Sequence, residues 1–373
     1  MNKLWSSVLH SIAKRPNRIN VISSFAAAFA GMLLGFVLMF IVSPGDSFGA
    51  FFNMVTGPFQ SMNRIGMVVR SSVPIMLTGL SVAFAFRTGL FNIGASGQMM
   101  IGAVIAIYIG VHWEFLGSFH WIVGIFGGII GGAMWGAIPG LLKAFRNVHE
   151  VVTSIMLNYV ALYVARLMIY TFMEDTLRGS SLRVARTARI PEGFLPQIFG
   201  GARVDISIII ALMVAVGIHF VLNRTTFGFE LKSVGLSRPA AQYAGIREKR
   251  SVVLSMVIAG ALSGLAGALY FLVGDRQFGL SDGIIEYGFT GIAIALLALS
   301  APLGVIIAAF FYGVIYRGGW LIQTVYREEI IDIIIGFIIY FSALSLFTKQ
   351  VIANYLRKKT KREIEIAEKE GDV

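Results

Sequence analysis

The stretch GLFNIGASGQMMIGA, residues 89–103, places an asparagine, a serine, a glutamine and four glycines between two strongly apolar segments. Arg87 and Thr88, just before it, are suited to end a membrane-spanning helix at the membrane surface. Non-helical backbone persists at membrane depth only where protein or a water-filled cavity surrounds it. The stretch therefore predicts that the chain turns and re-enters the membrane inside a helical bundle. The glycines expected to allow this turn are Gly89, Gly94, Gly97 and Gly102.

The composition places the chain among polytopic membrane proteins. Of its 373 residues, 56% are hydrophobic and 14% are charged, and the mean hydropathy is +0.77. This apolar content exceeds what a soluble core can bury. The chain has no cysteine, so disulfides, thiolate metal sites and cysteine nucleophiles are excluded. The net charge of +11 fits short cytoplasmic loops and anionic lipid headgroups better than a nucleic-acid partner.

Apolar segments of about 20 residues can span the bilayer as helices, because every backbone amide then finds its partner within the helix. Ten segments are suited to this, some marginally, and they lie near 21–42, 71–87, 98–113, 121–142, 150–172, 205–222, 251–273, 284–300, 302–320 and 330–348. We expect an all-α integral membrane protein with about ten transmembrane helices.

Three domains are predicted. They are an N-terminal cytoplasmic or interfacial segment (1–20), a transmembrane domain (21–348) and a charged cytoplasmic tail (349–373). A helix lying in the membrane interface fits the apolar positions of the first segment, and a disordered tail is the alternative. With the N-terminus inside, 20 of the 31 lysines and arginines fall on the inner side and ten on the outer, with Arg166 inside the fifth span. This asymmetry assigns both termini to the cytoplasm.

Glycines recur every four residues along the predicted fourth span. They are Gly124, Gly128, Gly132, Gly136 and Gly140. This spacing puts them on one face of a helix, where a neighbouring helix can approach closely. Gly260 and Gly264 in the seventh span repeat the pattern more weakly. We interpret these glycines as packing surfaces.

The chain lacks the motifs of an enzyme. It contains no GxxxxGK[ST] phosphate loop and no HExxH zinc motif, and GASGQ does not have the spacing of a serine nucleophile elbow. We expect no catalytic residue, metal site or ATP hydrolysis in this chain, so the energy for transport must come from elsewhere. Ionisable residues deep in the predicted spans are scarce, which favours an uncharged polar solute.

The loop 223–250 is too long for a turn and too regular for a linker. A first short helix is expected over Phe229–Val234, ended by Gly235 in a left-handed conformation. Ser237 can cap a second helix with Pro239 in its first turn, and Gly245 can end it. Such a helix pair would give a partner protein a rigid contact surface. An amphipathic connector resting on the bilayer is the alternative.

Three stretches resemble the permease subunits of bacterial ABC importers of the ribose and branched-chain amino acid class, and nucleoside-type permeases in particular. They are LTGLSVAFAFRTGLFNIGASGQMMIGA (77–103), VHEVVTSIMLNYVALYV (148–164) and GFELKSVGLSRPAAQYAGI (228–246). The resemblance implies a second permease subunit, related or identical, a pair of cytoplasmic ATPase subunits that bind ATP and Mg, and a substrate-binding lipoprotein outside. This branch usually has glutamate where Ser96 stands and asparagine where His149 stands.

The resemblance also assigns a role to residues of the loop 223–250. Those expected to couple this chain to the ATPase are Gly228, Glu230, Leu231, Lys232, Gly235, Ser237, Ala240, Ala241, Gly245 and Ile246.

Polar residues in the re-entrant stretch and in the fifth span are candidates for lining the pathway. They are Asn92, Ser96, Gln98, Thr153, Ser154 and Asn158. Local hydrogen bonds to freed backbone amides, or contacts between helices, are the alternative for each.

The predicted outer loop 173–204 is rich in arginine, against the positive-inside tendency. Acidic lobes of a binding protein could dock on these side chains, and a solvated loop is the alternative. The candidate docking residues are Arg178, Arg183, Arg186 and Arg189.

The predicted function is therefore that of a transmembrane subunit of an ATP-driven importer. Nucleosides are the first substrate class that the resemblance implies, and ribose-like sugars are the next. A self-sufficient secondary transporter or channel is the alternative from a different class.

Overall fold

The computed structural model describes residues 16–343. These fall into two compact units, one of residues 52–322 and one formed by the described residues up to 51 and from 323 onward. The expected interfacial helix at the start of the chain and the charged tail 349–373 lie outside the described residues. The fold is all-α and polytopic, as predicted.

Seven helices among residues 16–343 are long and apolar enough to cross a membrane. They are α4 (Met62–Arg87), α5 (Ala95–His112), α6 (His120–Arg146) with the preceding 3-10 turn, α7 (Glu150–Phe172), α9 (Ser207–Arg224), α12 (Glu248–Phe271) and α14 (Pro302–Leu321). All seven belong to the larger unit and coincide with predicted spans.

Short elements connect these helices. In the larger unit they are η1 (Gly57–Phe59), η2 (Glu114–Phe119), the antiparallel pair β1 (Glu174–Asp175) and β2 (Ser180–Ser181), η3 (Arg186–Ala188), α8 (Leu195–Ile198), α10 (Thr226–Leu236), α11 (Arg238–Tyr243) and α13 (Tyr287–Leu297). The expected span near 284–300 is therefore a helix of 11 residues. At 1.5 Å per residue α13 is about 17 Å long, roughly half of the hydrocarbon thickness.

The smaller unit pairs α2 (Pro16–Val42) with α15 (Glu328–Ala343), and the first half of α3 (Ser47–Thr56) belongs to it. Gly35 leaves room for the side chain of Ile334, and the Tyr326 hydroxyl donates to the carbonyl of Met39 at 3.1 Å. These helices match the first and last predicted spans.

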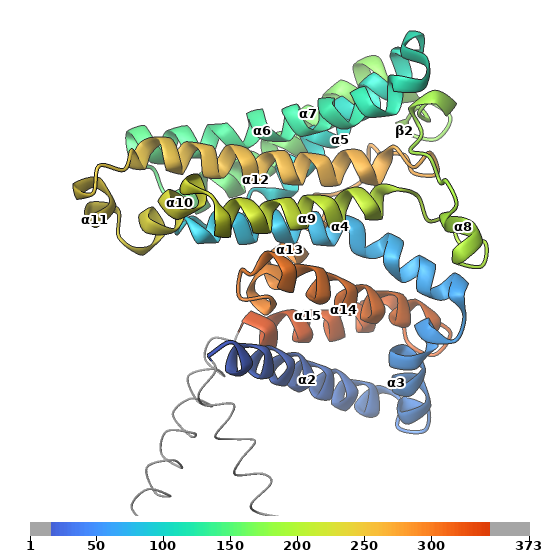
Figure 1. Ribbon diagram of the computed structural model, residues 1–373. Coiled ribbons are helices and arrows are strands. Elements are labelled where there is room, and N and C mark those ends of the chain that lie inside the picture. The colour runs from blue at the N-terminus through green and yellow to red at the C-terminus, as the bar shows by residue number, and fades with distance from the viewer. Residues whose placement is uncertain (1–15, 344–373) are drawn as a thin grey trace, which may run out of the picture. The chain divides into compact units, whose positions relative to one another are not determined.

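Helices α4, α5 and α12 form the core of the larger unit. In the 18-residue apolar stretch of each of these helices, 89%, 78% and 72% of the residues are buried. The corresponding fractions are 33% for α7 and 22% for α9. In Figure 1 α10 and α11 lie at one end of these helices, and β2 and α8 lie at the opposite end. We call these ends the α10 end and the α8 end.

The glycine face of α6 packs on α12, which confirms the predicted packing surface. A Cβ atom on Gly132 would overlap the carbonyl oxygen of Gly260 and lie 2.5 Å from Cα of Gly264. Gly128 and Gly136 approach α12 in the same way. Lipid tails are as apolar as the side chains, so close backbone contact of this kind is what holds such helices together.

Candidate functional site

The chain turns sharply between α4 and α5 at the α10 end, as the sequence predicted. Gly89 adopts a left-handed conformation (φ +70°), and Gly94 precedes the first residue of α5. Gly97 and Gly102 do not contribute to the turn, because both lie inside α5. They pack instead against neighbouring helices, Gly97 on Asn158 of α7 and Gly102 on α6 and α12. The expectation for these two glycines was wrong, since close helix packing also requires the absence of a side chain.

A buried network of polar side chains links the turn to α12. Asn92 and Gln98 exchange two amide hydrogen bonds, of 2.9 and 3.0 Å. Asn92 also donates to the hydroxyl of Ser81 in α4 at 3.0 Å, and Ser263 of α12 donates to the same hydroxyl at 2.9 Å. The Ser81 hydroxyl in turn donates a hydrogen bond of 2.6 Å to the carbonyl of Ala259. All four polar side chains are fully buried, so the network fixes the turn inside the bundle.

Asn158 of α7 holds the turn from the other side. Its Oδ1 accepts from the backbone N–H of Gly97 at 2.8 Å, and its Nδ2 donates to the carbonyl of Ile93 at 3.0 Å. Ser154, one turn earlier in α7, is buried against Gly94. Thr153 faces elsewhere and donates to the carbonyl of His149 at 3.2 Å. Five of the six candidate pathway residues are thus gathered around the turn, and Thr153 is not.

Ser96 marks the point where two helices begin face to face. The hydroxyl is fully buried and has no hydrogen-bond partner among the described residues. A Cβ atom on Gly288, in the first turn of α13, would overlap the backbone nitrogen of Ser96. Tyr287 begins α13, and its carbonyl accepts a 2.8 Å hydrogen bond from Thr78 of α4. The N-termini of α5 and α13 therefore meet beside the middle of α4.

Thr78, Ser81 and Ser263 were not among the residues predicted from the sequence. They lie in segments that read as uniformly apolar, where single hydroxyls can bond to their own helix. Thr78 and Ser81 stand three residues apart and so share one face of α4, which is a signal that could have identified them.

Two helices form in the loop 223–250, as predicted. Thr225 caps α10 by accepting from the N–H of Gly228 at 3.1 Å, and Ser237 caps α11 by accepting from Ala240 at 3.4 Å. Pro239 lies in the first turn of α11, and Gly245 follows that helix with φ +80°.

The role expected for Gly235 was wrong. It lies inside α10 rather than ending it, and a Cβ atom there would overlap the carbonyl oxygen of Arg87. Gly235 therefore seats α10 directly on the end of α4. Three large apolar side chains of this helix pair project into open space, with exposures of 67%, 89% and 94%: Phe229, Leu236 and Tyr243.

The predicted coupling residues divide into two groups. Gly228, Leu231 and Ala241 are buried and hold the helix pair on the bundle. The remainder are exposed or half-buried: Glu230, Lys232, Gly235, Ser237, Ala240, Gly245 and Ile246.

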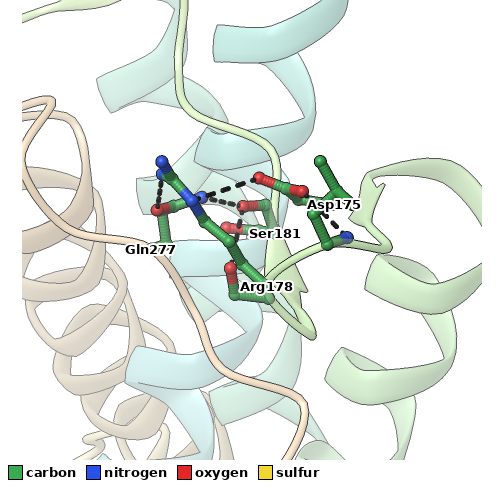
Figure 2. A network of polar contacts seen from close by, with 6 residues as sticks. Asp175, Arg178, Ser181 and Gln277 are labelled. Atoms are coloured by element: carbon green, nitrogen blue, oxygen red, sulfur yellow. Dashed lines mark hydrogen bonds and ion pairs between the residues drawn. The ribbon is translucent and has the colours of Figure 1, made fainter.

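At the α8 end, a polar network fixes the loop that carries β1 and β2 (Figure 2). Arg178 lies 3.9 Å from the carboxylate of Asp175 and donates to Oε1 of Gln277 at 3.2 Å. Gln277 donates to the carbonyl of Ser181 at 2.6 Å, and the Ser181 hydroxyl accepts from the N–H of Phe278 at 3.0 Å. Arg178 therefore contacts Asp175 in its own loop and bonds to Gln277 in the segment between α12 and α13, while Arg183 is exposed.

A cleft of about 1050 Å³ opens at the same end. Three arginines line it, of which Arg186 and Arg189 were predicted docking residues and Arg203 was not. Glu192 and Asp275 are the carboxylates in its wall. Positive charge dominates the cleft.

The profile of the family described as "Branched-chain amino acid transport system / permease component" matches residues 64–343. The chain belongs to this permease family. The permease is 36% identical to a guanosine ABC transporter permease of Bacillus subtilis strain 168, over 89% of this chain and 95% of the relative. It is 30% identical to a nucleoside ABC transporter permease of Lactococcus lactis subsp. cremoris, over 94% of this chain and 98% of the relative. A second guanosine permease of the same Bacillus strain is 26% identical, over 65% of this chain and 77% of the relative.

The permease thus combines three distinct features in one unit. A polar core lies around the re-entrant turn, an exposed helix pair sits at one end, and a basic cleft lies at the other. Of the two departures noted in the sequence, Ser96 is packed against Gly288, and His149 caps α7 by accepting from Val151 at 3.3 Å.

Proposed function

We propose that the permease forms the translocation pathway of an ATP-driven importer whose solute is a nucleoside. The observation that carries this proposal is the match to guanosine and nucleoside permeases along nearly the whole length of both chains. Relatives that share a pathway-forming subunit over its full length commonly share the chemistry of the solute. This chain supplies the passage, and separate subunits bind ATP and Mg and hydrolyse ATP.

The helix pair α10–α11 is the proposed contact with the ATPase. Leu236 and Tyr243 are 89% and 94% exposed on a small, capped element. Large apolar side chains on a rigid element are typical anchors of protein interfaces. The seat of Gly235 on the end of α4 would pass movement of the helix pair into the core of the bundle.

The basic cleft at the α8 end is the proposed contact with a substrate-binding lipoprotein outside the cell. Arg186, Arg189 and Arg203 line it, and the exposed Arg183 lies nearby in sequence. Acidic side chains of the binding protein would be attracted to this end. In this proposal the permease lies in the bacterial cell membrane, with the loop 223–250 and both termini in the cytoplasm.

A second permease subunit completes the passage in this proposal. Two guanosine permeases of one Bacillus strain match this chain, which favours a related chain as the partner over an identical copy.

Reconstitution tests the function. The permease, its partner permease, the ATPase and the binding protein are placed in proteoliposomes, and uptake of tritiated guanosine is measured with and without ATP. We expect accumulation only with ATP and with an ATPase whose phosphate-loop lysine is intact. Accumulation against a gradient by this polypeptide alone would show a secondary transporter instead.

The coupling contact is tested by Leu236→Asp and Tyr243→Asp. Each should abolish co-purification of the ATPase and ATP-driven uptake, because a charge replaces an apolar anchor. Leu177→Asp is the matched control, since Leu177 is 96% exposed and lies in the loop between β1 and β2. Equal loss in all three variants would contradict a specific contact.

Docking is tested by reversing Arg183 and Arg186 to glutamate. Uptake at limiting binding protein should fall, with recovery at high binding-protein concentration, because the change weakens association. Unaltered uptake at limiting binding protein would contradict docking at this end.

A further inference from the structure

Aromatic rings and guanidinium groups gather where α12, α13 and α14 approach one another. Tyr270 lies in the last turn of α12 and Tyr287 begins α13, and their ring centroids are 5.1 Å apart at an angle of 62°. The guanidinium carbon of Arg276, in the segment between these helices, lies 3.7 Å from the centre of the Tyr270 ring. The three side chains are therefore in continuous contact: the Arg276 guanidinium lies over the Tyr270 ring, and the two tyrosine rings meet edge to face.

Helix α14 adds a second guanidinium to this group. Nε of Arg317 donates to the hydroxyl of Ser71 at 2.7 Å, and its guanidinium carbon lies 5.2 Å from the ring centre of Trp320. The charge of Arg317 interacts with Tyr287 and with Arg276. We call Tyr270, Arg276, Tyr287 and Arg317 the aromatic–arginine cluster.

The cluster reaches well into the membrane. The carbonyl of Tyr287 bonds to Thr78, which stands nine residues before Arg87 at the end of α4. This places Tyr287 about 14 Å from the α10 end of that helix, at 1.5 Å per residue, within a hydrocarbon layer about 30 Å thick. Arg317 lies nearer the α8 end, because it bonds to Ser71, which stands sixteen residues before Arg87, or about 24 Å along α4. Arginine within the hydrocarbon layer almost always faces protein or a water-filled cavity, because exposure to lipid is costly.

The four side chains are half-buried, so part of each surface is accessible. Arg70 nearby is taken up by its ion pair with Asp275 at 2.7 Å. By contrast, neither Arg276 nor Arg317 forms an ion pair with any residue in the range 16–343. Nε of Arg317 bonds to Ser71, and the other donors of the two guanidinium groups are available to an uncharged ligand that carries hydrogen-bond acceptors.

We propose that the aromatic–arginine cluster contacts the base of a nucleoside as it crosses the membrane, which rests on the function proposed above. Tyrosine rings offer faces on which any base can stack. A guanidinium can donate two parallel hydrogen bonds to O6 and N7 of guanine. A simple sugar has no aromatic face, so this cluster would distinguish a nucleoside from ribose.

The absence of cysteine from the chain makes a direct test possible. Tyr316→Cys places a single thiol beside the cluster, since Tyr316 directly precedes Arg317 in α14 and its ring lies 6.2 Å from the Trp320 ring that Arg317 overlies. The complete reconstituted importer carrying this variant is treated with a charged methanethiosulfonate, with guanosine or ribose at equal concentration. Guanosine should slow modification at least about threefold and ribose should not. Leu177→Cys, in the loop at the α8 end, should be modified at one rate throughout.

Equal slowing by ribose and guanosine would overturn recognition of the base. Unprotected modification, or a thiol that never reacts, would overturn contact with the passage. Failure of the unsubstituted importer to take up guanosine would instead refute the proposed function.

A second measurement separates contact from folding. Tyr287→Leu should lower guanosine uptake about tenfold at saturating binding protein, and Tyr287→Phe should restore it to within about twofold. Tyr108→Leu, which removes a half-buried ring of α5 away from the cluster, is the matched control. Equal losses in the Leu and Phe variants, or in the control, would contradict a stacking role.

Discussion

The Nε atom of Arg87 donates a 2.9 Å hydrogen bond to the backbone carbonyl of Ser300. This bond joins the end of α4 to the turn between α13 and α14. Leu299 and Ser300 in that turn both have positive φ, of 50° and 55°, a conformation that costs free energy in residues with a side chain. Gly235 of α10 packs on the backbone of the same Arg87. One arginine therefore lies between the proposed ATPase contact and the half-helix α13.

Replacing Arg87 with methionine should uncouple the helix pair α10–α11 from α13. The variant loses a hydrogen bond from a charged group, of about 1.5–3 kcal/mol, while keeping much of the side-chain length. We expect ATP hydrolysis by the assembled importer to continue while guanosine uptake falls severalfold. Arg224→Met, at the same end of α9, serves as the control because Arg224 is exposed. The idea fails if both variants transport equally well.

Gly235→Ala should displace α10 from its seat. The added methyl group would overlap the carbonyl oxygen of Arg87, and backbone atoms cannot move aside cheaply. ATP-driven uptake should be lost while the protein remains in the membrane. Gly217→Ala should be silent, because a Cβ atom there meets nothing within 4 Å. ATP-driven uptake at the unsubstituted level by Gly235→Ala would show that transport does not require the close packing of α10 on Arg87.

Gly132→Leu should prevent assembly of the bundle. The side chain would have to occupy the space of the α12 backbone at Gly260 and Gly264. We expect little protein of native size on gel filtration in detergent. Gly217→Leu is the control for adding a large apolar side chain. A monodisperse, active Gly132→Leu protein would contradict the packing of α6 on α12 through this glycine.

Asn158→Leu tests whether this residue holds the turn or lines the passage. It leaves the N–H of Gly97 and the carbonyl of Ile93 unsatisfied, at about 1–3 kcal/mol each. The thermal midpoint should fall together with uptake. Thr153→Val, which removes one hydrogen bond at an exposed position, should leave both unchanged. Loss of uptake at an unchanged midpoint would favour a direct contact with the solute.

Asp205 gives a pH-dependent prediction. Burial raises the pKa of this carboxyl group, although hydrogen bonds from Ser207 and the charges of Arg70 and Arg276 oppose the shift. Its Oδ1 caps the N–H of Ser207 at 2.9 Å, and its Oδ2 has no partner among the described residues. A carboxyl group whose pKa is higher when folded destabilises the fold when ionised, and this cost disappears as the pH falls below about 4.

Asp205→Asn keeps an oxygen that accepts from the N–H of Ser207 and removes the buried charge. Its thermal midpoint should exceed that of the unsubstituted protein at pH 7, and the difference should narrow as the pH approaches about 4. Asp205→Ala loses this hydrogen bond, worth about 0.5–1.5 kcal/mol, and should melt lower than Asp205→Asn at every pH. A difference in thermal midpoint between Asp205→Asn and the unsubstituted protein that does not change with pH would contradict the Asp205 charge as its cause.

Features that depend on composition and on local residue order could be predicted from the sequence. Long apolar runs can only be satisfied as helices in a membrane, and a serine before a proline caps a helix, so the spans and the pair α10–α11 were predictable. The glycine face of α6 was predictable because its period is that of a helix. Turn glycines and packing glycines look alike in a sequence, which is why Gly97, Gly102 and Gly235 were misassigned.

Which residues far apart in the sequence contact one another became known only from the packing of the helices. Ser81, Asn92 and Ser263 form one network although up to 182 positions separate them. Tyr287 and Arg317 join one cluster because α13 is too short to cross the membrane and begins beside Thr78. Contacts of this kind arise from how buried helices pack, and local sequence preference does not specify which faces pack together.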